Sequence, residues 1–196
     1  MSYSVAGAQT PVQADRRELF ESLLTKTHRH AYHLAVRLTG KRADAEDLVQ
    51  EAYLRAFRFF HRYDSSLPFT SWLYRIMTNA HIDEVRRRGK LKTTSLDDPH
   101  PETGAAWDLP DETASPERLV FTDELEAEIQ DGLNRMTPDF RVAVLLADME
   151  GFSYEEVSQI MGTSIGTVRS RIHRGRKQLR NHLLSVRPDR YGSQRK

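Results

Sequence analysis

The sequence contains no cysteine among its 196 residues. This absence excludes disulfide bonds, thiolate metal sites and direct sensing of oxidants by a thiol. The sequence also lacks an apolar run of about 18 residues or more, so no membrane insertion is expected. Its N-terminal stretch has no apolar block after a charged start, as a secretory signal would have. We therefore expect a cytoplasmic protein.

Strand patterns and enzyme motifs are missing as well. No stretch alternates apolar and polar residues as a strand would, which predicts an all-α fold. HExxH, GxSxG and phosphate-loop motifs are absent, so an enzyme such as a metal hydrolase is the weaker alternative. Its best candidates are His28, His30 and His33. On a helix the first two lie roughly 200° apart, so the three cannot easily converge, and we expect no metal or cofactor.

The net charge of +1 hides two basic blocks and one acidic segment. One block lies within residues 86–92 and the other within residues 169–180. Residues 97–131 carry twelve acidic residues, and Arg118 is their only base. This pattern indicates two nucleic-acid contacts on separate bodies. The alternative for either block is an ordinary solvated helix face.

Residues 151–181 read as two short helices joined by a tight turn. Ser153 and Glu156 have the spacing of a capping box, so the first helix is expected to begin near Tyr154. Gly162 breaks that helix, because glycine accepts the positive φ that a helix end often requires. Ser164 is the expected cap of the second helix. The order matches a helix-turn-helix unit.

The second helix of this unit has an apolar stripe and a polar, basic face. Ile165, Val168, Ile172 and Leu179 recur at helical spacing. The side chains that project away from the stripe suit contacts to base edges in the major groove; they include Arg169, Ser170, Arg174, His173 and Lys177. An amphipathic hairpin with a solvated basic face is the alternative.

The rest of the chain divides into helices and loops. Helices are expected over residues 15–39, 43–61, 70–88 and 117–135, and a fifth begins at Pro138. Prolines and acids interrupt residues 91–116, which predicts an extended acidic linker between two small helical domains. We expect a disordered tail over 1–14 and a frayed basic tail over 185–196. Apolar stripes place the side chains of Leu19, Phe59 and Met149 inside.

Two polar helix faces stand out in the first domain. Asp47, Gln50, Glu51 and Arg55 share one face of the second helix, which periodicity alone interprets as solvent-exposed. Asn79 and Asp83 share a face of the third helix, as i, i+4 neighbours do. That helix ends in Arg86, Arg87 and Arg88. Aromatic residues and loop donors beside a basic helix end suit unstacked single-stranded bases.

Three stretches, taken in their order, resemble bacterial sigma factors of the extracytoplasmic-function (ECF) group. They are DAEDLVQEAYLRAF (44–57), FTSWLYRIMTNAHIDEVRRR (69–88) and GFSYEEVSQIMGTSIGTVRSRIHRGRKQLR (151–180). The resemblance covers roughly residues 15–184. It implies sigma region 2 over 15–90, a linker over 91–116 and sigma region 4 over 117–184. It also implies a promoter-specificity subunit of RNA polymerase that is not an enzyme.

The resemblance assigns roles to particular side chains. It implies docking on the clamp helices of the polymerase largest subunit through Asp47, Gln50 and Glu51, flanked by Leu48 and Arg55, and so overrides the solvent-face interpretation. It implies −10 DNA contacts by Tyr63, Asp64, Asn79, Asp83, Arg86, Arg87 and Arg88. It implies −35 base contacts by Arg169, Ser170, His173 and Arg174, with Thr167 and Arg171 on phosphates and Lys177 beside them.

The expected partners follow from the same resemblance. They are the polymerase core, through its clamp helices and flap, promoter DNA and an anti-sigma factor. A stand-alone helix-turn-helix repressor or activator remains the second alternative. Such a protein would bind specific DNA tightly without polymerase, whereas a sigma factor is expected to bind promoters poorly until the core is present.

Overall fold

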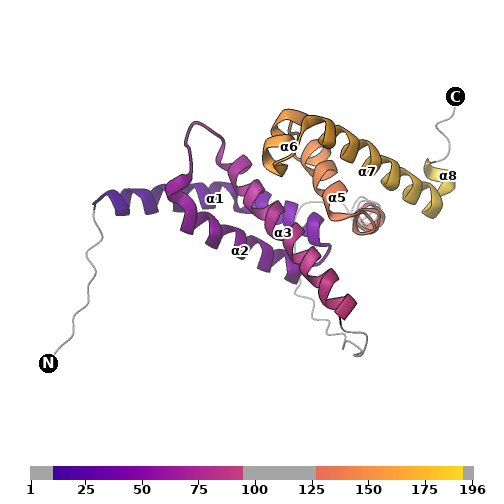
Figure 1. The fold of residues 1–196 in the computed structure, drawn as a ribbon, viewed down its shortest axis with the longest axis horizontal. Helices are drawn as coiled ribbons and strands as arrows, with labels where there is room; N and C mark the ends of the chain where they lie inside the picture. The colour runs from indigo at the N-terminus through magenta and orange to yellow at the C-terminus, as the bar shows by residue number, and fades with distance from the viewer. Residues whose placement is uncertain (1–10, 95–126, 192–196) are drawn as a thin grey trace, which may run out of the picture.

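The computed structural model describes residues 11–94 and 127–191, and within these ranges it contains helices and no strand. The first helical group comprises α1 (Pro11–Thr39), α2 (Arg42–Phe59), the short 3-10 helix η1 (Phe60–Arg62) and α3 (Phe69–Thr94). The second comprises helical residues 127–134, α5 (Pro138–Val144), the π-helical turn η2 (Leu145–Met149), α6 (Tyr154–Met161), α7 (Ile165–Val186) and α8 (Pro188–Tyr191). The all-α prediction is confirmed (Figure 1).

Three boundaries differ from the sequence prediction. α1 begins at Pro11, so residues 11–14 of the predicted tail are helical, and proline suits a first helical position because it needs no N–H there. α3 passes the predicted linker start, supported near its end by the Glu84–Arg88 pair at i, i+4 spacing. The predicted frayed tail completes α7 and forms α8. The predictions for residues 1–10, 95–126 and 192–196 lie outside the described residues.

One part of the hydrophobic core lies where α1, α2 and α3 pack side by side. Phe20 lies at its centre, with its ring edge-on to three other phenylalanine rings at centroid distances of 5.1 to 6.1 Å. Leu19 and Phe59, which the pattern places inside, are 50% and 39% exposed. Their neighbours Phe20 and Phe60 take the inward positions, and one residue along a helix turns a side chain by about 100°.

The same hydrophobic core continues between α5, η2, α6 and α7, where its side chains include Val142, Leu145, Val157, Ile160, Val168 and Ile172. The Glu150 N–H donates to the Leu145 carbonyl at 3.0 Å, so the turn holds one residue more than an α-helical turn. Met149 consequently faces outward and is 51% exposed, against the prediction. Ile165 is also exposed, because it opens α7 one turn ahead of the buried Val168.

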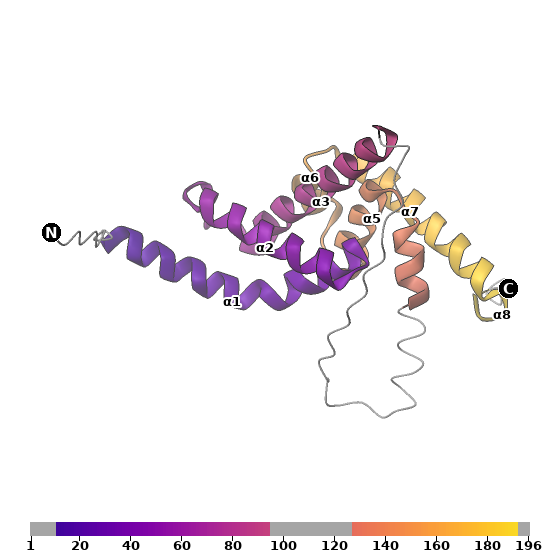
Figure 2. The same ribbon diagram turned by 90° about the horizontal axis from the view of Figure 1, so that it is seen from below.

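The two groups pack against each other, although the charge pattern indicated separate bodies. α3 contacts α5 and α6, and the C-terminal end of α1 meets α5 (Figures 1 and 2). The buried Arg141 of α5 donates to the Leu38 carbonyl of α1 and, at 2.8 Å, to the Asn134 carbonyl. Backbone carbonyls thus accept from both terminal nitrogens of a guanidinium that burial would otherwise penalise, whereas its Nε has no partner among the described residues.

A second contact joins α3 to the turn before α6. The Tyr74 hydroxyl donates to Glu150 Oε2 at 2.9 Å, and its ring lies edge-on to Phe152 at 5.8 Å. Burial, together with the adjacent Glu150 carboxylate, raises the pKa of Tyr74. The phenol therefore stays protonated and remains a donor across the interface.

We predict that Gly175→Ala destabilises the second group. The added Cβ would lie 2.6 Å from Val144 Cγ2 and 3.3 Å from the Phe140 carbonyl oxygen, so α5 and α7 must separate. Overpacking of this kind costs roughly 1–3 kcal/mol. Urea unfolding, monitored by circular dichroism, measures this loss of stability. The matched control is Gly166→Ala, whose nearest contact is 3.9 Å away and which should be neutral or stabilising. Equal midpoints for both variants would contradict this packing.

Candidate functional site

The local structure of the helix-turn-helix unit follows the sequence prediction. Ser153 Oγ accepts from the Glu156 N–H at 3.2 Å, and the Glu156 carboxylate accepts from the Ser153 N–H at 2.8 Å. Gly162 ends α6 with φ of 60°, which a glycine adopts without strain. Ser164 Oγ accepts from the Thr167 N–H at 3.2 Å and so caps α7. These caps fix the angle at which α7 leaves the turn.

α7 presents most of its predicted DNA contacts on one open face. Its buried stripe runs through Val168 and Ile172, and the exposed side chains on the opposite side are Arg169, Ser170, His173, Arg174 and Lys177. The other two predicted contacts are half-buried. Thr167 Oγ1 lies 2.9 Å from Ser164 Oγ, and Arg171 Nη2 pairs with Asp139 Oδ1 at 2.8 Å. Arginine and serine on such a helix suit base edges in a major groove.

The predicted docking set divides between surface and core. Asp47, Gln50 and Glu51 are exposed on α2, and Arg55 pairs with Glu51 across one turn. Leu48 is buried beneath them, so the structure does not bring its side chain to that surface. Leu54, which the sequence analysis did not assign, is 57% exposed one turn beyond. The i, i+3, i+4, i+7 spacing from Asp47 to Leu54 could have revealed it.

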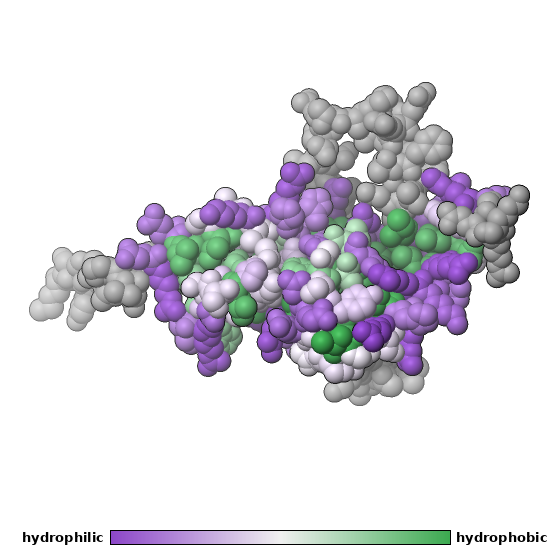
Figure 3. All heavy atoms as spheres, turned by 90° about the horizontal axis from the view of Figure 1, so that it is seen from above, coloured by the Kyte–Doolittle hydropathy of each residue, from purple (hydrophilic) through white to green (hydrophobic). Residues whose placement is uncertain are grey.

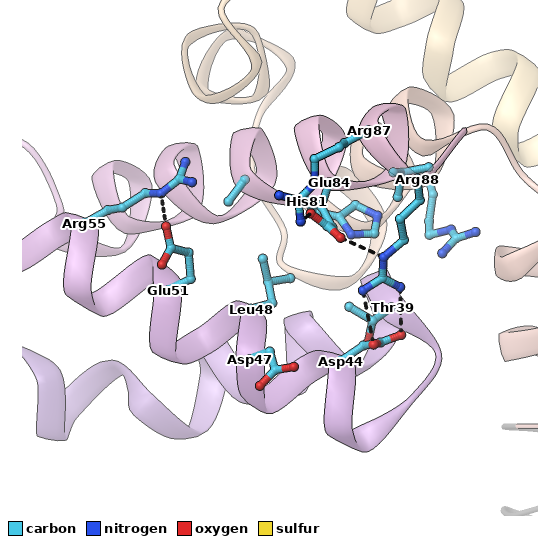
Figure 4. Close-up of a pocket in the computed structure, with 13 residues that line it drawn as sticks. Thr39, Asp44, Asp47, Leu48, Glu51, Arg55, His81, Glu84, Arg87 and Arg88 are labelled. Atoms are coloured by element: carbon cyan, nitrogen blue, oxygen red, sulfur yellow. Dashed lines mark hydrogen bonds and ion pairs between the residues drawn. The ribbon is translucent and has the colours of Figure 1, made fainter. Parts of the chain in front are cut away.

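A cavity of about 580 Å³ between α2 and α3 brings the docking set and part of the −10 set together (Figure 4). Asp47, Leu48, Glu51 and Arg55 line it from α2, and Arg87 and Arg88 line it from α3. Arg88 donates to Glu84 at 2.7 Å and to Asp44 at 3.4 Å. The hydrogen bond from Arg88 holds the pKa of Glu84 below its ordinary value. These arginines are therefore already paired with carboxylates of the protein.

The remaining −10 residues lie elsewhere on the first group. Tyr63 stacks on Phe60 at 5.6 Å, and its hydroxyl donates to the Leu67 carbonyl at 2.8 Å. Asp64 accepts from the Ser66 N–H at 2.9 Å, which lowers the pKa of this carboxyl and folds the loop. Asn79 lines a separate cavity of about 230 Å³, whereas Asp83 is exposed and does not line it.

The wall of that second cavity holds residues that the sequence analysis did not assign to DNA. They are Phe59, Arg62, Arg75 and Ile76, together with the aromatic Trp72. The Arg62 guanidinium lies over the Phe59 ring at 5.3 Å. An aromatic wall, guanidinium groups and the Asn79 amide offer stacking and hydrogen bonding together.

Comparison with known proteins places these features in one family. The model of sigma-70 region 2 matches residues 23–91, and the model of sigma-70 region 4 matches residues 126–179. The RNA polymerase sigma-H factor of Pseudomonas aeruginosa is 33% identical over 172 residues, which are 86% of this chain and 88% of that protein. The chain belongs to the ECF family of RNA polymerase sigma factors. As such it is a transcription initiation factor and not an enzyme.

Two further similarities agree with this assignment. The ECF sigma factor SigE of Mycolicibacterium smegmatis is 42% identical over 84% of this chain, which spans 61% of that relative's length. The structure of the sigma factor RpoE of Bartonella quintana in complex with the anti-sigma factor NepR superposes with a TM-score of 0.66 at 28% identity. That superposition covers 84% of this chain and 96% of RpoE. The first helical group is thus region 2 and the second is region 4.

Neither metal sites nor membrane spans occur in the described part of this sigma factor. Among residues 11–94 and 127–191, no group of three or more histidine, aspartate or glutamate side chains is placed to hold a metal ion. The His28 ring stacks on Tyr53 instead, at 6.2 Å. No helix within these ranges has the length and apolar content needed to cross a bilayer.

His81 contributes a buried imidazole to the wall of the larger cavity, beside Arg141. It is 5% exposed, and its Nε2 has no hydrogen-bond partner in the part of the chain that the structure describes. Burial, reinforced by the charges of Arg141 and Arg88, lowers the pKa of His81 to about 4. The imidazole is therefore neutral where region 4 meets region 2.

We predict that His81 makes the folded protein sensitive to acid. The unfolded chain binds a proton near pH 6.5, whereas the folded chain does so only near pH 4. Stability should therefore fall as the pH drops from about 6.5 to 4, by roughly 3 kcal/mol in total. His81→Gln removes this titration and should flatten the profile of unfolding free energy against pH in that window. An unchanged profile in the variant would show that His81 is not the group responsible.

Proposed function

We propose that this ECF sigma factor binds core RNA polymerase, reads the −35 element with α7, and reads and opens the −10 element with region 2. It would act in the cytoplasm, where polymerase and promoters are, and start transcription of a specialised, stress-related set of genes. The observation that carries the proposal is the open face of α7, with five donor-bearing side chains exposed over a buried Val168–Ile172 stripe.

The α7 face suits a division of work between its side chains. Arg169, Ser170, His173 and Arg174 project from the face that enters a major groove and would contact base edges. Thr167, Arg171 and Lys177 would contact phosphates, which position the helix without specifying a sequence. Thr167 lies in the first turn of α7, where backbone N–H groups also favour an anion.

Docking on polymerase would use the exposed face of α2. Asp47, Gln50 and Glu51 supply acceptors and charge, and Leu54 supplies an apolar side chain within that polar surround. Interfaces often concentrate their binding energy in such a side chain, which is desolvated while polar neighbours exclude water. We assign this surface to the clamp helices of the polymerase largest subunit, and region 4 to the flap.

The smaller cavity beside Asn79 would receive an unstacked base of the −10 element. Its wall combines Phe59 and Trp72 with two arginines, and its volume is about 230 Å³. Extruding a base costs a few kcal/mol of stacking, which a pocket that stacks and hydrogen-bonds the base offsets. Tyr63 and Asp64 would shape the adjoining loop. Asp83, Arg86, Arg87 and Arg88 would follow the strand along α3.

An anti-sigma factor is the further partner that we propose. The support is the likeness to RpoE, whose structure was solved in complex with the anti-sigma factor NepR. Figure 3 shows hydrophobic areas set among polar side chains on one face of the molecule. Exposed apolar side chains on α2, Leu54 and Phe57, would form part of the covered surface.

Run-off transcription with purified core polymerase tests the proposal. Templates would come from transcript starts mapped after overexpression of this chain. We expect promoter-dependent product only when both the chain and the core are present. A stand-alone repressor or activator would instead bind specific DNA tightly without core. Absence of promoter-dependent product on every such template would overturn the proposed function.

We predict that Leu54→Ala weakens binding to core polymerase by about tenfold, because it removes buried apolar area from the centre of the docking face. Fluorescence anisotropy of the labelled chain titrated with core measures the effect. Val186→Ala on α7 is the matched control, since Val186 is 46% exposed and lies outside the proposed surface. Equal affinities of the two variants would place the docking surface elsewhere.

A further inference from the structure

Asp139 of α5 contacts two arginines that belong to different regions. Its Oδ1 pairs with Arg171 Nη2 of α7 at 2.8 Å, and its Oδ2 lies 3.7 Å from Arg86 Nη2 of α3. The Asp139 and Arg171 side chains are 27% and 23% exposed, and the Arg86 side chain is 62% exposed. The first pair is therefore partly shielded from water, and the second is a looser contact across the region 2–region 4 interface.

Both arginines are among the residues assigned above to promoter DNA, Arg171 at the −35 element and Arg86 at the −10 element. Elements about 25 base pairs apart lie roughly 80 Å apart on straight B-form DNA. Two arginines that share one carboxylate cannot serve both elements at the same time. The Asp139–Arg86 contact, which joins the two regions, therefore belongs to a state of the chain that is not engaged with a whole promoter. The Asp139–Arg171 pair lies within region 4 and must open for Arg171 to contact a phosphate.

The fold holds the Asp139 carboxylate in place. Thr137 and Pro138 begin α5, and Asp139 lies in its first turn, where the helix dipole favours an anion. Arg141, two residues on, holds this end of α5 against the Leu38 carbonyl of α1. The carboxylate thus presents two oxygens to two guanidinium groups, the arrangement that a DNA phosphate would also offer.

We propose that Asp139 substitutes for a DNA phosphate within the free chain. It occupies Arg171 and Arg86 and so reduces the affinity of the free sigma factor for DNA. The inference deepens the proposed function and rests on its assignment of these arginines to DNA. Occupancy by a phosphate requires the carboxylate to release Arg171, and separation of the two regions releases Arg86.

The test is DNA binding by the free full-length chain carrying Asp139→Asn. The probe is a duplex of about 30 base pairs of arbitrary sequence, because phosphate contacts do not depend on sequence. At low salt we expect affinity to rise about three- to tenfold. The plot of log K against log salt should steepen by about one to two units, one for each arginine that gains a phosphate.

Asp148→Asn is the matched control, because it removes the same charge from beside α7. Asp148 is 31% exposed and pairs with Arg176, which is not among the assigned DNA contacts. Asp139→Ser provides a second neutral exchange in case Asp139→Asn folds poorly. Adding Arg86→Ala and Arg171→Ala to Asp139→Asn should abolish the gain, because no released arginine then remains.

The outcomes separate the inference from a general charge effect. A larger gain for Asp139→Asn than for Asp148→Asn, lost in the triple variant, supports the proposal. Equal gains, no gain, or a gain that survives the loss of both arginines overturns it. If run-off transcription succeeds while Asp139→Asn shows no gain, this inference fails and the proposed function stands. If Asp139→Asn gains DNA affinity but no template gives promoter-dependent transcription, the proposed function fails, while the effect of Asp139 on DNA binding stands.

Discussion

The structure depends on one buried guanidinium. Arg141 reaches from α5 to the Leu38 carbonyl at the end of α1 and to carbonyls of the segment before α5. These acceptors are backbone carbonyls and not carboxylates, and burial lowers the pKa of Arg141. Its Nη1 keeps its acceptor only while α1 and α5 lie together, because their separation would leave that donor to water or to another partner. The contact therefore links the relative placement of regions 2 and 4 to the local packing of each.

Several functional surfaces meet around that link. The larger cavity has Arg141 and His81 in its wall and is also lined by the α2 carboxylates proposed for docking, Asp47 and Glu51, and by two arginines of α3. The Tyr74–Glu150 hydrogen bond and the Asp139 contacts lie on the same side of α3. A partner that binds α2 thus comes close to side chains that hold regions 2 and 4 together. Separation of regions 2 and 4 would have to be driven by the binding free energy of polymerase or DNA.

The sequence predicted best what is decided locally. Ser153, Glu156, Gly162 and Ser164 act within a few residues of one another, so their spacing alone specified the helix-turn-helix. It failed where distant residues decide: nothing near Arg141 indicates that its partner is a carbonyl 103 residues away. The resemblance placed Leu48 on the docking surface and passed over Leu54, although six residues along a helix turn the two side chains about 120° apart and only Leu54 is exposed. Of the cavity proposed for a −10 base, the sequence indicated Asn79 but not Phe59, because Phe59 was expected inside.

We infer that regions 2 and 4 pack together in the free chain and separate when the chain engages a promoter. The absence of cysteine makes one measurement direct, since His30→Cys in region 2 and Gln178→Cys in region 4 would be the only thiols. Spin labels at these positions report the distance between regions by double electron–electron resonance. We expect one population with a short distance for the free chain, and a distance longer by roughly tens of ångströms when core and promoter are bound. The same short distance in both states would contradict this inference.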